Sequence, residues 1–99
     1  MRLVAVIAFV AACSKPAPQT YQVDIRAMQF TPDVVHAGKG DHIVWTNHDL
    51  VPHTVTSSGK FDSGPVQPGQ QWTYTVPEAQ EYDYACTMHP TMHGQLLAP

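Results

Sequence analysis

Three side chains of metal-binding types follow one another at intervals of three near the end of the chain. Cys86, His89 and Met92 offer a thiolate, an imidazole and a thioether. Given the numbers of Cys, His and Met in the chain, this order and spacing would arise by chance about 0.005 times. Soft sulfur donors beside imidazole favour copper, and one Cys with two His and a weak axial Met forms a type 1 copper site. The spacing therefore predicts a copper site that takes a second histidine from elsewhere in the chain.

His53 is the predicted second histidine. It follows a loop and opens an expected strand, so its ring would project from a strand end toward the Cys86 loop. Cys86 would bind as the thiolate, the two histidines as neutral imidazoles, and the methionine as a long axial contact that tunes the reduction potential. The predicted cofactor-binding residues, all ligands of one type 1 copper ion, are His53, Cys86, His89 and Met92. The remaining histidines, His36, His42, His48 and His93, are predicted to lie on the surface.

Other uses of these residues compete with this interpretation. A copper-binding chaperone or storage protein of the cell envelope would hold the same ion, but such sites are usually open and rich in Met. A structural zinc site is disfavoured because Met is a poor zinc ligand and further cysteines are missing. The sequence has no His-x-His pair for a second copper centre and no nucleophile beside a base, so no catalytic residues are expected and the protein is predicted not to be an enzyme. A disulfide between Cys13 and Cys86 is the alternative fate of the two cysteines in an exported protein.

The first twelve residues have the pattern of an export signal. After Met1-Arg2, ten apolar residues would span only about 15 Å as a helix, half of a bilayer core, so residues 1–12 are predicted to be a signal peptide. Val10-Ala11-Ala12-Cys13 resembles the lipobox of bacterial lipoproteins, which implies lipidation of Cys13 and a protein anchored to a membrane in the bacterial periplasm. Residues 13–20 would form the tether. Ordinary secretion with cleavage elsewhere is the alternative.

Residues 21–99 are predicted to form one all-β domain. Short runs with strand-like alternation are separated by Gly and Pro turns, and no convincing helical stripe follows residue 20. The expected strands are 21–28, 34–36, 42–46, 54–57, 71–76, 81–86 and 94–98. About seven to eight such strands indicate a β-sandwich. Trp45 and Phe30 are expected in the core, and Tyr82 as a corner tyrosine that bonds the backbone.

The charge content excludes one class of partner. Charged residues make up 13% of the chain, the formal net charge is −3, and no two Lys or Arg residues are adjacent. A nucleic-acid surface would need clustered cations facing the phosphates, so no nucleic-acid binding is expected.

Several motifs together resemble the plastocyanin/amicyanin branch of the cupredoxins, the type 1 blue copper proteins. The resemblance covers residues 21–98 and includes Phe30-Thr31-Pro32, Gly40 to Asn47, His53-Thr54-Val55, Phe61 to Gly64, Pro68-Gly69, Tyr82 to Cys86 and the short loop from Cys86 to Met92. It implies a Greek-key β-sandwich and a periplasmic electron carrier whose copper cycles between Cu(II) and Cu(I). The loop is most similar to that of amicyanin.

The resemblance also implies how the site is supported and used. Asn47 would hydrogen-bond the backbone of Thr87, beside the Cys ligand. An apolar patch through which the electron leaves is expected at Pro52, Met88, His89 and Pro90. Transient redox proteins would dock there: a donor dehydrogenase or cytochrome, and an acceptor cytochrome, oxidase or reductase. The protein is expected to be a monomer.

Overall fold

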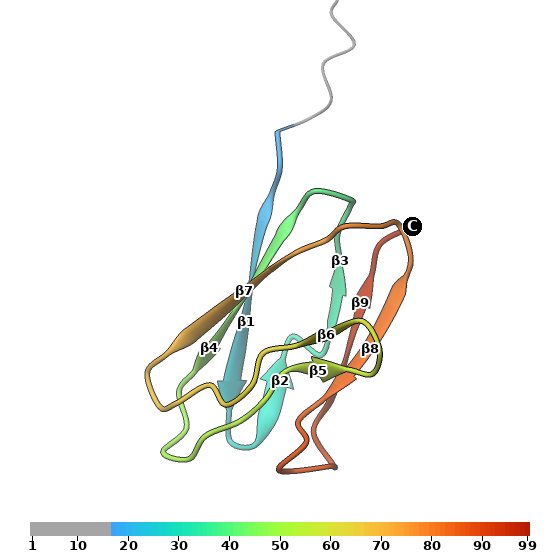
Figure 1. Ribbon diagram of the computed structural model, residues 1–99. Helices are drawn as coiled ribbons and strands as arrows, with labels where there is room; N and C mark the ends of the chain where they lie inside the picture. The colour runs from blue at the N-terminus through green and yellow to red at the C-terminus, as the bar shows by residue number, and fades with distance from the viewer. Residues whose placement is uncertain (1–16) are drawn as a thin grey trace, which may run out of the picture.

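The structure is a computed structural model that describes residues 17–99, and all of its regular elements are strands (Figure 1). The predicted signal peptide, Cys13 and the first half of the predicted tether, residues 13–16, lie outside the described residues. The strands are β1 (Thr20–Arg26), β2 (Gln29–Thr31), β3 (Val34–His36), β4 (His42–Asn47), β5 (Thr56–Ser57), β6 (Phe61–Asp62), β7 (Gln71–Thr75), β8 (Glu81–Ala85) and β9 (His93–Leu97). No helix in residues 17–99 is long and apolar enough to cross a membrane.

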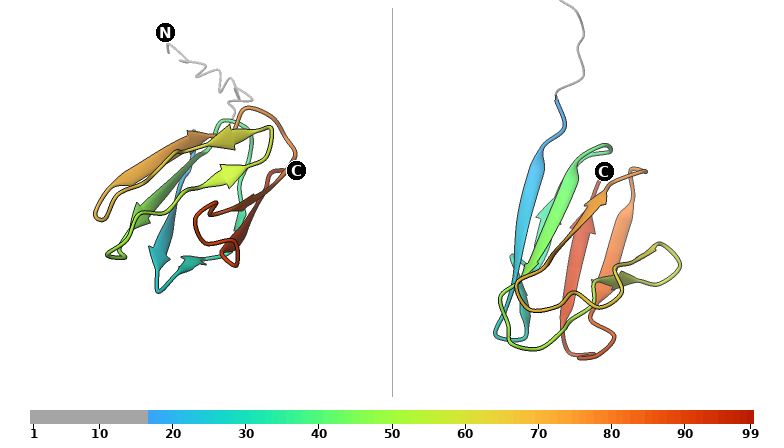
Figure 2. Two further views of the ribbon diagram at one scale, coloured as in Figure 1. Left: turned by 60° about the horizontal axis from the view of Figure 1, so that its bottom comes forward. Right: turned by 60° about the vertical axis from the view of Figure 1, so that its left-hand side comes forward.

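The strands form two sheets that face each other (Figure 2). One sheet has the order β2-β1-β4-β7 and the other the order β3-β9-β8-β5-β6. β1 pairs in parallel with β4, and β3 in parallel with β9, whereas the other pairs are antiparallel. The predicted all-β sandwich is confirmed, and the strand count exceeds the prediction because β2 and β6 are too short to show periodicity in the sequence.

The β1–β2 turn differs from the sequence prediction. The strand expected at 21–28 ends at Arg26, because the chain reverses through Ala27 and Met28, whose φ angles are 52° and 60°. Left-handed φ angles are uncommon in residues other than glycine, asparagine and aspartate, so the sequence carries no turn signal here. The prediction of a continuous strand was therefore wrong at its last two residues.

Alternating apolar residues build the core between the sheets. In β1, Val23 and Ile25 are fully buried while their neighbours are not, as expected of a strand with one face on the core. Trp45 and Phe30 are buried, as predicted. The Tyr82 hydroxyl donates a hydrogen bond to the Glu78 carbonyl oxygen at 2.9 Å, which confirms the corner tyrosine.

Two loops meet at the end of the sandwich opposite the start of β1 (Figure 1). The first, residues 48–55, follows β4, and the second, residues 86–92, joins β8 to β9. The first loop begins where β4 of one sheet ends, and the second begins where β8 of the other sheet ends. They therefore bring together segments that are far apart in the sequence. These loops carry all four predicted copper ligands.

Candidate metal centre

His53 is held inside the first loop by a small β-bridge. Its backbone N–H donates to the Val66 carbonyl oxygen at 3.2 Å and its carbonyl oxygen accepts from the Val66 N–H at 2.7 Å. The side chain is fully buried. These two hydrogen bonds hold the backbone of this predicted ligand in place.

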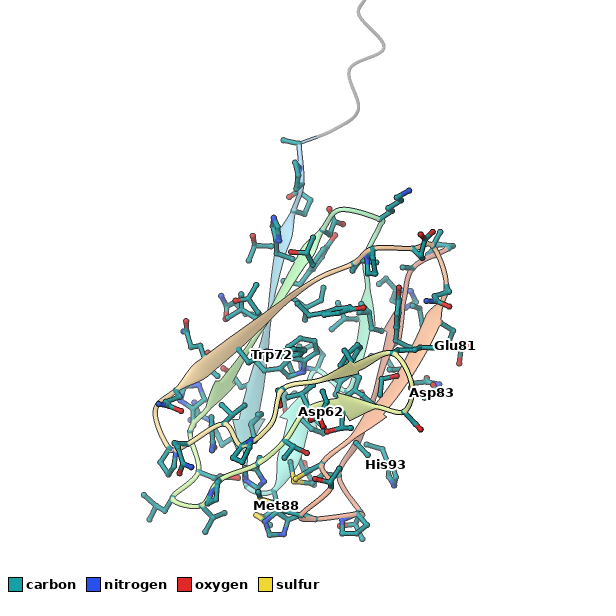
Figure 3. The ribbon with its side chains drawn as sticks, in the orientation of Figure 1. Asp62, Trp72, Glu81, Asp83, Met88 and His93 are labelled. Carbon is teal, nitrogen blue, oxygen red and sulfur yellow. The ribbon has the colours of Figure 1, made fainter. Side chains whose placement is uncertain are left out.

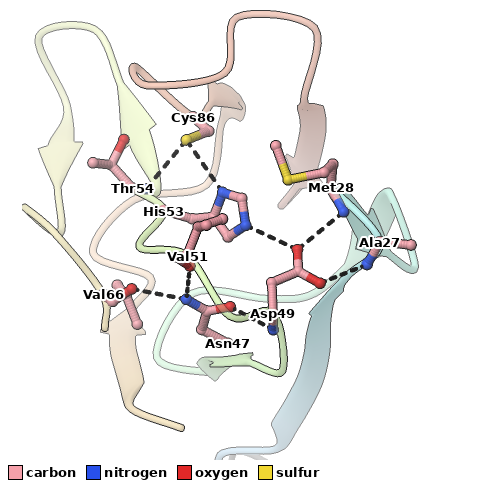
Figure 4. A network of polar contacts seen from close by, with 9 residues as sticks. All are labelled: Ala27, Met28, Asn47, Asp49, Val51, His53, Thr54, Val66 and Cys86. Atoms are coloured by element: carbon pink, nitrogen blue, oxygen red, sulfur yellow. Dashed lines mark hydrogen bonds and ion pairs between the residues drawn. The ribbon is translucent and has the colours of Figure 1, made fainter. Parts of the chain in front are cut away.

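The predicted ligands His53 and Cys86 lie in direct contact. His53 Nδ1 and Cys86 Sγ are 3.7 Å apart, and both side chains are buried (Figure 4). Two donors bonded to one ion at about 2.0 Å for imidazole and about 2.3 Å for thiolate, at an angle of about 110–120°, lie about 3.5–3.7 Å apart. The observed separation therefore fits a shared ion.

The Cys86 sulfur also accepts a hydrogen bond from the backbone. The Thr54 N–H points at Sγ at 3.3 Å. The Thr54 hydroxyl oxygen accepts from the Thr87 N–H at 2.9 Å and lies 3.0 Å from the Thr87 hydroxyl. A sulfur bound to a metal ion would keep this backbone hydrogen bond as an additional contact. Thr54 was not predicted as a site residue, because its only signal in the sequence is its position next to His53.

The loop from Cys86 to Met92 is closed by its own backbone. The Cys86 N–H donates to the Met92 carbonyl oxygen at 3.1 Å, and the Met92 N–H to the His89 carbonyl oxygen at 2.9 Å. Met92 is buried, with 2% of its surface exposed. The closed loop presents His89 from its outer side and Met92 from its inner side.

His89 stands beside the buried pair but does not complete a cluster. Its ring centroid is 4.9 Å from that of His53, with the planes at 63°. In the described part of the chain, no three or more His, Cys, Asp and Glu side chains converge tightly enough to hold a metal ion by themselves. The two buried side chains are in direct contact, and the half-buried His89 is adjacent to them.

Asn47 supports the site through contacts other than the predicted one. Its Nδ2 donates to the carbonyl oxygens of Val51 at 2.8 Å and Val66 at 2.9 Å, and its Oδ1 accepts from the Asp49 N–H at 2.9 Å. The predicted hydrogen bond between Asn47 and Thr87 was wrong. The Asn47 amide is used in holding the first loop, and Thr54 takes the Thr87 N–H instead.

Asp49 is a second residue of the site that was not predicted from the sequence. Its Oδ2 lies 2.9 Å from His53 Nε2, and the carboxylate accepts from the backbone N–H groups of Ala27 at 2.8 Å and Met28 at 3.0 Å (Figure 4). Burial raises the pKa of the Asp49 carboxyl, but hydrogen bonds from the two backbone groups and the His53 ring outweigh it, so the pKa lies below its usual value. A loop aspartate four residues before a histidine is not a recognisable sequence signal.

Apolar side chains are exposed in the two loops that carry the predicted ligands and in the β1–β2 turn. Met88 is 44% exposed and lies at the loop end of the sandwich (Figure 3). Pro90 is exposed, and Pro52 and His89 are half-buried. Three further exposed apolar residues were not predicted: Leu50 at 94%, Val51 at 41% and Met28 at 40%. We call Met28, Leu50, Val51, Pro52, Met88 and Pro90 the apolar patch.

The other four histidines lie away from the core, as predicted. His36, His48 and His93 are exposed and His42 is half-buried. His48 pairs with Asp24 at 2.8 Å, and His42 contacts the Thr75 hydroxyl at 2.8 Å.

Comparisons with known proteins place the chain in a family. A family model described as "Cupredoxin-like domain" matches residues 1–98. Amicyanin of Paracoccus denitrificans is 33% identical over 92 residues, which are 87% of this chain and 70% of that protein. Amicyanin-alpha of Methylorubrum extorquens is 32% identical over 92 residues, 83% of this chain and 73% of that protein.

Solved structures agree. The Cu(I) form of an amicyanin variant superposes with a TM-score of 0.78 at 29% identity, covering 84% of this chain and 85% of that one. The oxidized state of another amicyanin variant gives a TM-score of 0.77 at 29% identity, covering 81% and 82%. The chain belongs to the cupredoxin-like family, in the amicyanin branch of the cupredoxins.

Proposed function

We propose that this chain is a periplasmic electron carrier that binds one type 1 copper ion through His53, Cys86, His89 and Met92. The observation that carries the proposal is the buried contact of 3.7 Å between His53 Nδ1 and Cys86 Sγ, drawn from two distant loops. Amicyanin relatives and their Cu(I) structures support it. The chain is a carrier and not an enzyme, and the alternative of a copper chaperone or storage protein is not favoured.

The proposed ligands differ in how deeply the protein buries them. His53 and Cys86 are buried and held by backbone hydrogen bonds, so they change little when the charge of the site changes. His89 is half-buried in a short loop, and its ring centroid lies 4.9 Å from that of His53. When bound, copper supplies a one-electron change between Cu(II) and Cu(I), and a rigid donor set keeps the reorganisation small.

The apolar patch is the proposed surface for electron exchange. Four of its members are at least 40% exposed, and two of the six, Met88 and Pro90, are the chain neighbours of the partly exposed His89. Weak redox encounters bury little surface, so a small apolar patch is sufficient for docking and rapid release. Donor and acceptor proteins would use it in turn.

We also propose that lipid on Cys13 anchors the protein to a membrane facing the periplasm. The support is the lipobox-like Val10-Ala11-Ala12-Cys13 alone. A stable anchor takes more than one acyl chain, so the lipid on Cys13 would have to carry at least two. The single cysteine of this segment would carry the anchor.

A visible spectrum tests the copper site. Adding Cu(II) to the purified apoprotein should produce an intense visible band, because a short covalent bond between thiolate and Cu(II) gives one and a chaperone-type site does not. Cys86→Ser should fold with an unchanged far-ultraviolet spectrum and lose the band. Cys13→Ser, which removes the other cysteine, should keep it and also lose membrane attachment. A band that persists in Cys86→Ser would contradict the proposal.

A further inference from the structure

Two aspartate–histidine pairs of nearly equal length occur in residues 17–99, in different surroundings. Asp24 and His48 lie 2.8 Å apart with side chains 49% and 37% exposed, whereas Asp49 and His53 lie 2.9 Å apart with side chains 14% and 0% exposed. The second pair includes a proposed copper ligand. The first therefore serves as an internal reference for the second.

The hydrogen-bond chemistry of the buried pair fixes the state of the His53 ring. An ionised carboxylate only accepts hydrogen bonds, so Nε2 must carry the hydrogen that points at Asp49 Oδ2. In the neutral imidazole, Nδ1 then holds the lone pair. This atom is the one that faces Cys86 Sγ. The carboxylate thus selects the tautomer that has a free donor atom on the metal side.

Asp49 is itself held firmly. Its two carboxylate oxygens accept from Ala27 N–H and Met28 N–H in the left-handed turn, and its own N–H donates to Asn47 Oδ1 at 2.9 Å. Each neighbour that contacts the carboxylate is a donor, which favours the ionised form over the protonated one. A fixed negative charge therefore sits directly behind the His53 ring.

We propose that Asp49 is a positioning residue that fixes the metal-binding tautomer of His53 and biases the site toward the oxidised ion. A negative charge hydrogen-bonded to a ligand imidazole raises the basicity of that ligand. It stabilises a doubly charged ion more than a singly charged one. The inference rests on the proposed copper ligands, and it adds that this carboxylate lowers the reduction potential.

The first test compares Asp49→Asn with Asp24→Asn. Asp49→Asn should weaken Cu(II) binding about 10–100-fold, the usual effect of losing such a partner. It should lower the ratio of Cu(II) to Cu(I) affinity about tenfold, which raises the potential by about 59 mV for one electron. Asp24→Asn removes an equal charge from the exposed pair. It should leave the Cu(II) affinity and the ratio of Cu(II) to Cu(I) affinity within about twofold of the wild-type values. Equal potentials for the two variants would overturn the proposal, even if Asp49→Asn is less stable.

The second test needs no copper. In the wild-type apoprotein, nitrogen-15 spectra of the His53 ring should show the hydrogen on Nε2, protected from exchange with solvent. A hydrogen on Nδ1 would overturn the proposal whether or not Asp49→Asn folds. Asp49→Glu keeps the negative charge. Its potential should therefore differ from that of the wild type by no more than about half of the shift seen in Asp49→Asn. Absence of the thiolate band from wild-type protein would instead refute the proposed copper site, so the two failures are distinguishable.

Discussion

At the scale of single residues, the position of Gly94 shows how tightly the core is packed beside the loop from Cys86 to Met92. A Cβ added at Gly94 would overlap the Cζ and Oη atoms of Tyr84, which belong to a rigid aromatic ring. Tyr84 is 3% exposed, and burial raises its pKa to about 12. Gly94 pairs with Tyr84 across β8 and β9, directly after the loop that ends at Met92. Gly94 thus leaves space for the ring beside the proposed ligands.

Substitution of Gly94 should therefore be costly. Gly94→Ala is expected to reduce the free energy of unfolding by about 1–3 kcal/mol, the usual cost of forcing extra volume into a packed core. Urea denaturation of the apoprotein measures it. Gly38→Ala is the matched control, because a Cβ there would meet only the Asp41 Oδ2 atom at an ordinary 3.5 Å. Equal stability of the two variants would show that the sheet shifts freely to admit the methyl group.

At the scale of elements, one buried amide joins the end of β4, the first loop and the segment around Val66. Asn47 ends β4 and is fully buried. It donates to Val51 within the loop and to Val66, which forms the bridge to His53. The loop has no regular hydrogen-bond ladder, so this side chain replaces one. The register of His53 therefore depends on a residue six positions before it.

Truncation of Asn47 should loosen the loop more than its size suggests. Asn47→Ala removes the side-chain donor of the Val51 carbonyl oxygen, one of the two donors of the Val66 carbonyl oxygen and the acceptor of the Asp49 N–H. Each buried group left unsatisfied costs about 1–3 kcal/mol. We expect a loss of about 2–4 kcal/mol in unfolding free energy, together with faster amide exchange at residues 49–53. Gln22→Ala, at an exposed position of β1, should change neither the unfolding free energy nor the amide exchange of residues 49–53. Unchanged exchange in Asn47→Ala would mean that the loop is held by other contacts.

At the scale of the whole molecule, the parts that follow local patterns could be predicted and the parts that depend on long-range contacts could not. The β-sandwich followed from alternation in segments such as residues 42–46, and the buried aromatic residues from the same pattern. The use of Asn47 depended on which carbonyl group lies nearest in three dimensions, and the contact predicted from resemblance was wrong. Asp49, Thr54 and the turn at Ala27 carry no local signal, because their partners lie 4 to 33 residues away.

Asp41 makes the stability of the molecule depend on acid. Its carboxylate accepts from the Gln19 N–H at 2.9 Å and the Gly38 N–H at 2.8 Å, at the end of the sandwich where β1 begins. These hydrogen bonds, that of Gln19 first, hold the pKa of Asp41 below its usual value. A carboxyl with a lowered folded-state pKa stabilises the fold above its unfolded pKa of about 3.9, and that contribution is lost as the pH falls through the folded value.

The expected result is a stability difference that depends on pH. At pH 7, Asp41→Asn should unfold at a lower urea concentration than the wild type, and at pH 3 the two should approach each other. Urea titrations at both values measure the difference. A constant gap between the curves would indicate that the charge of Asp41 contributes nothing.

The contact between the two tryptophans gives the protein a spectroscopic label of its own. Trp45 is fully buried in β4, Trp72 is half-buried in β7, and their ring centroids are 5.4 Å apart at 35°. Aromatic rings locked in an asymmetric environment produce near-ultraviolet circular dichroism that disappears when fixed packing is lost. Indole emission and this dichroism should therefore follow the folding of the colourless apoprotein, so its integrity can be measured with no dye and before any copper is added.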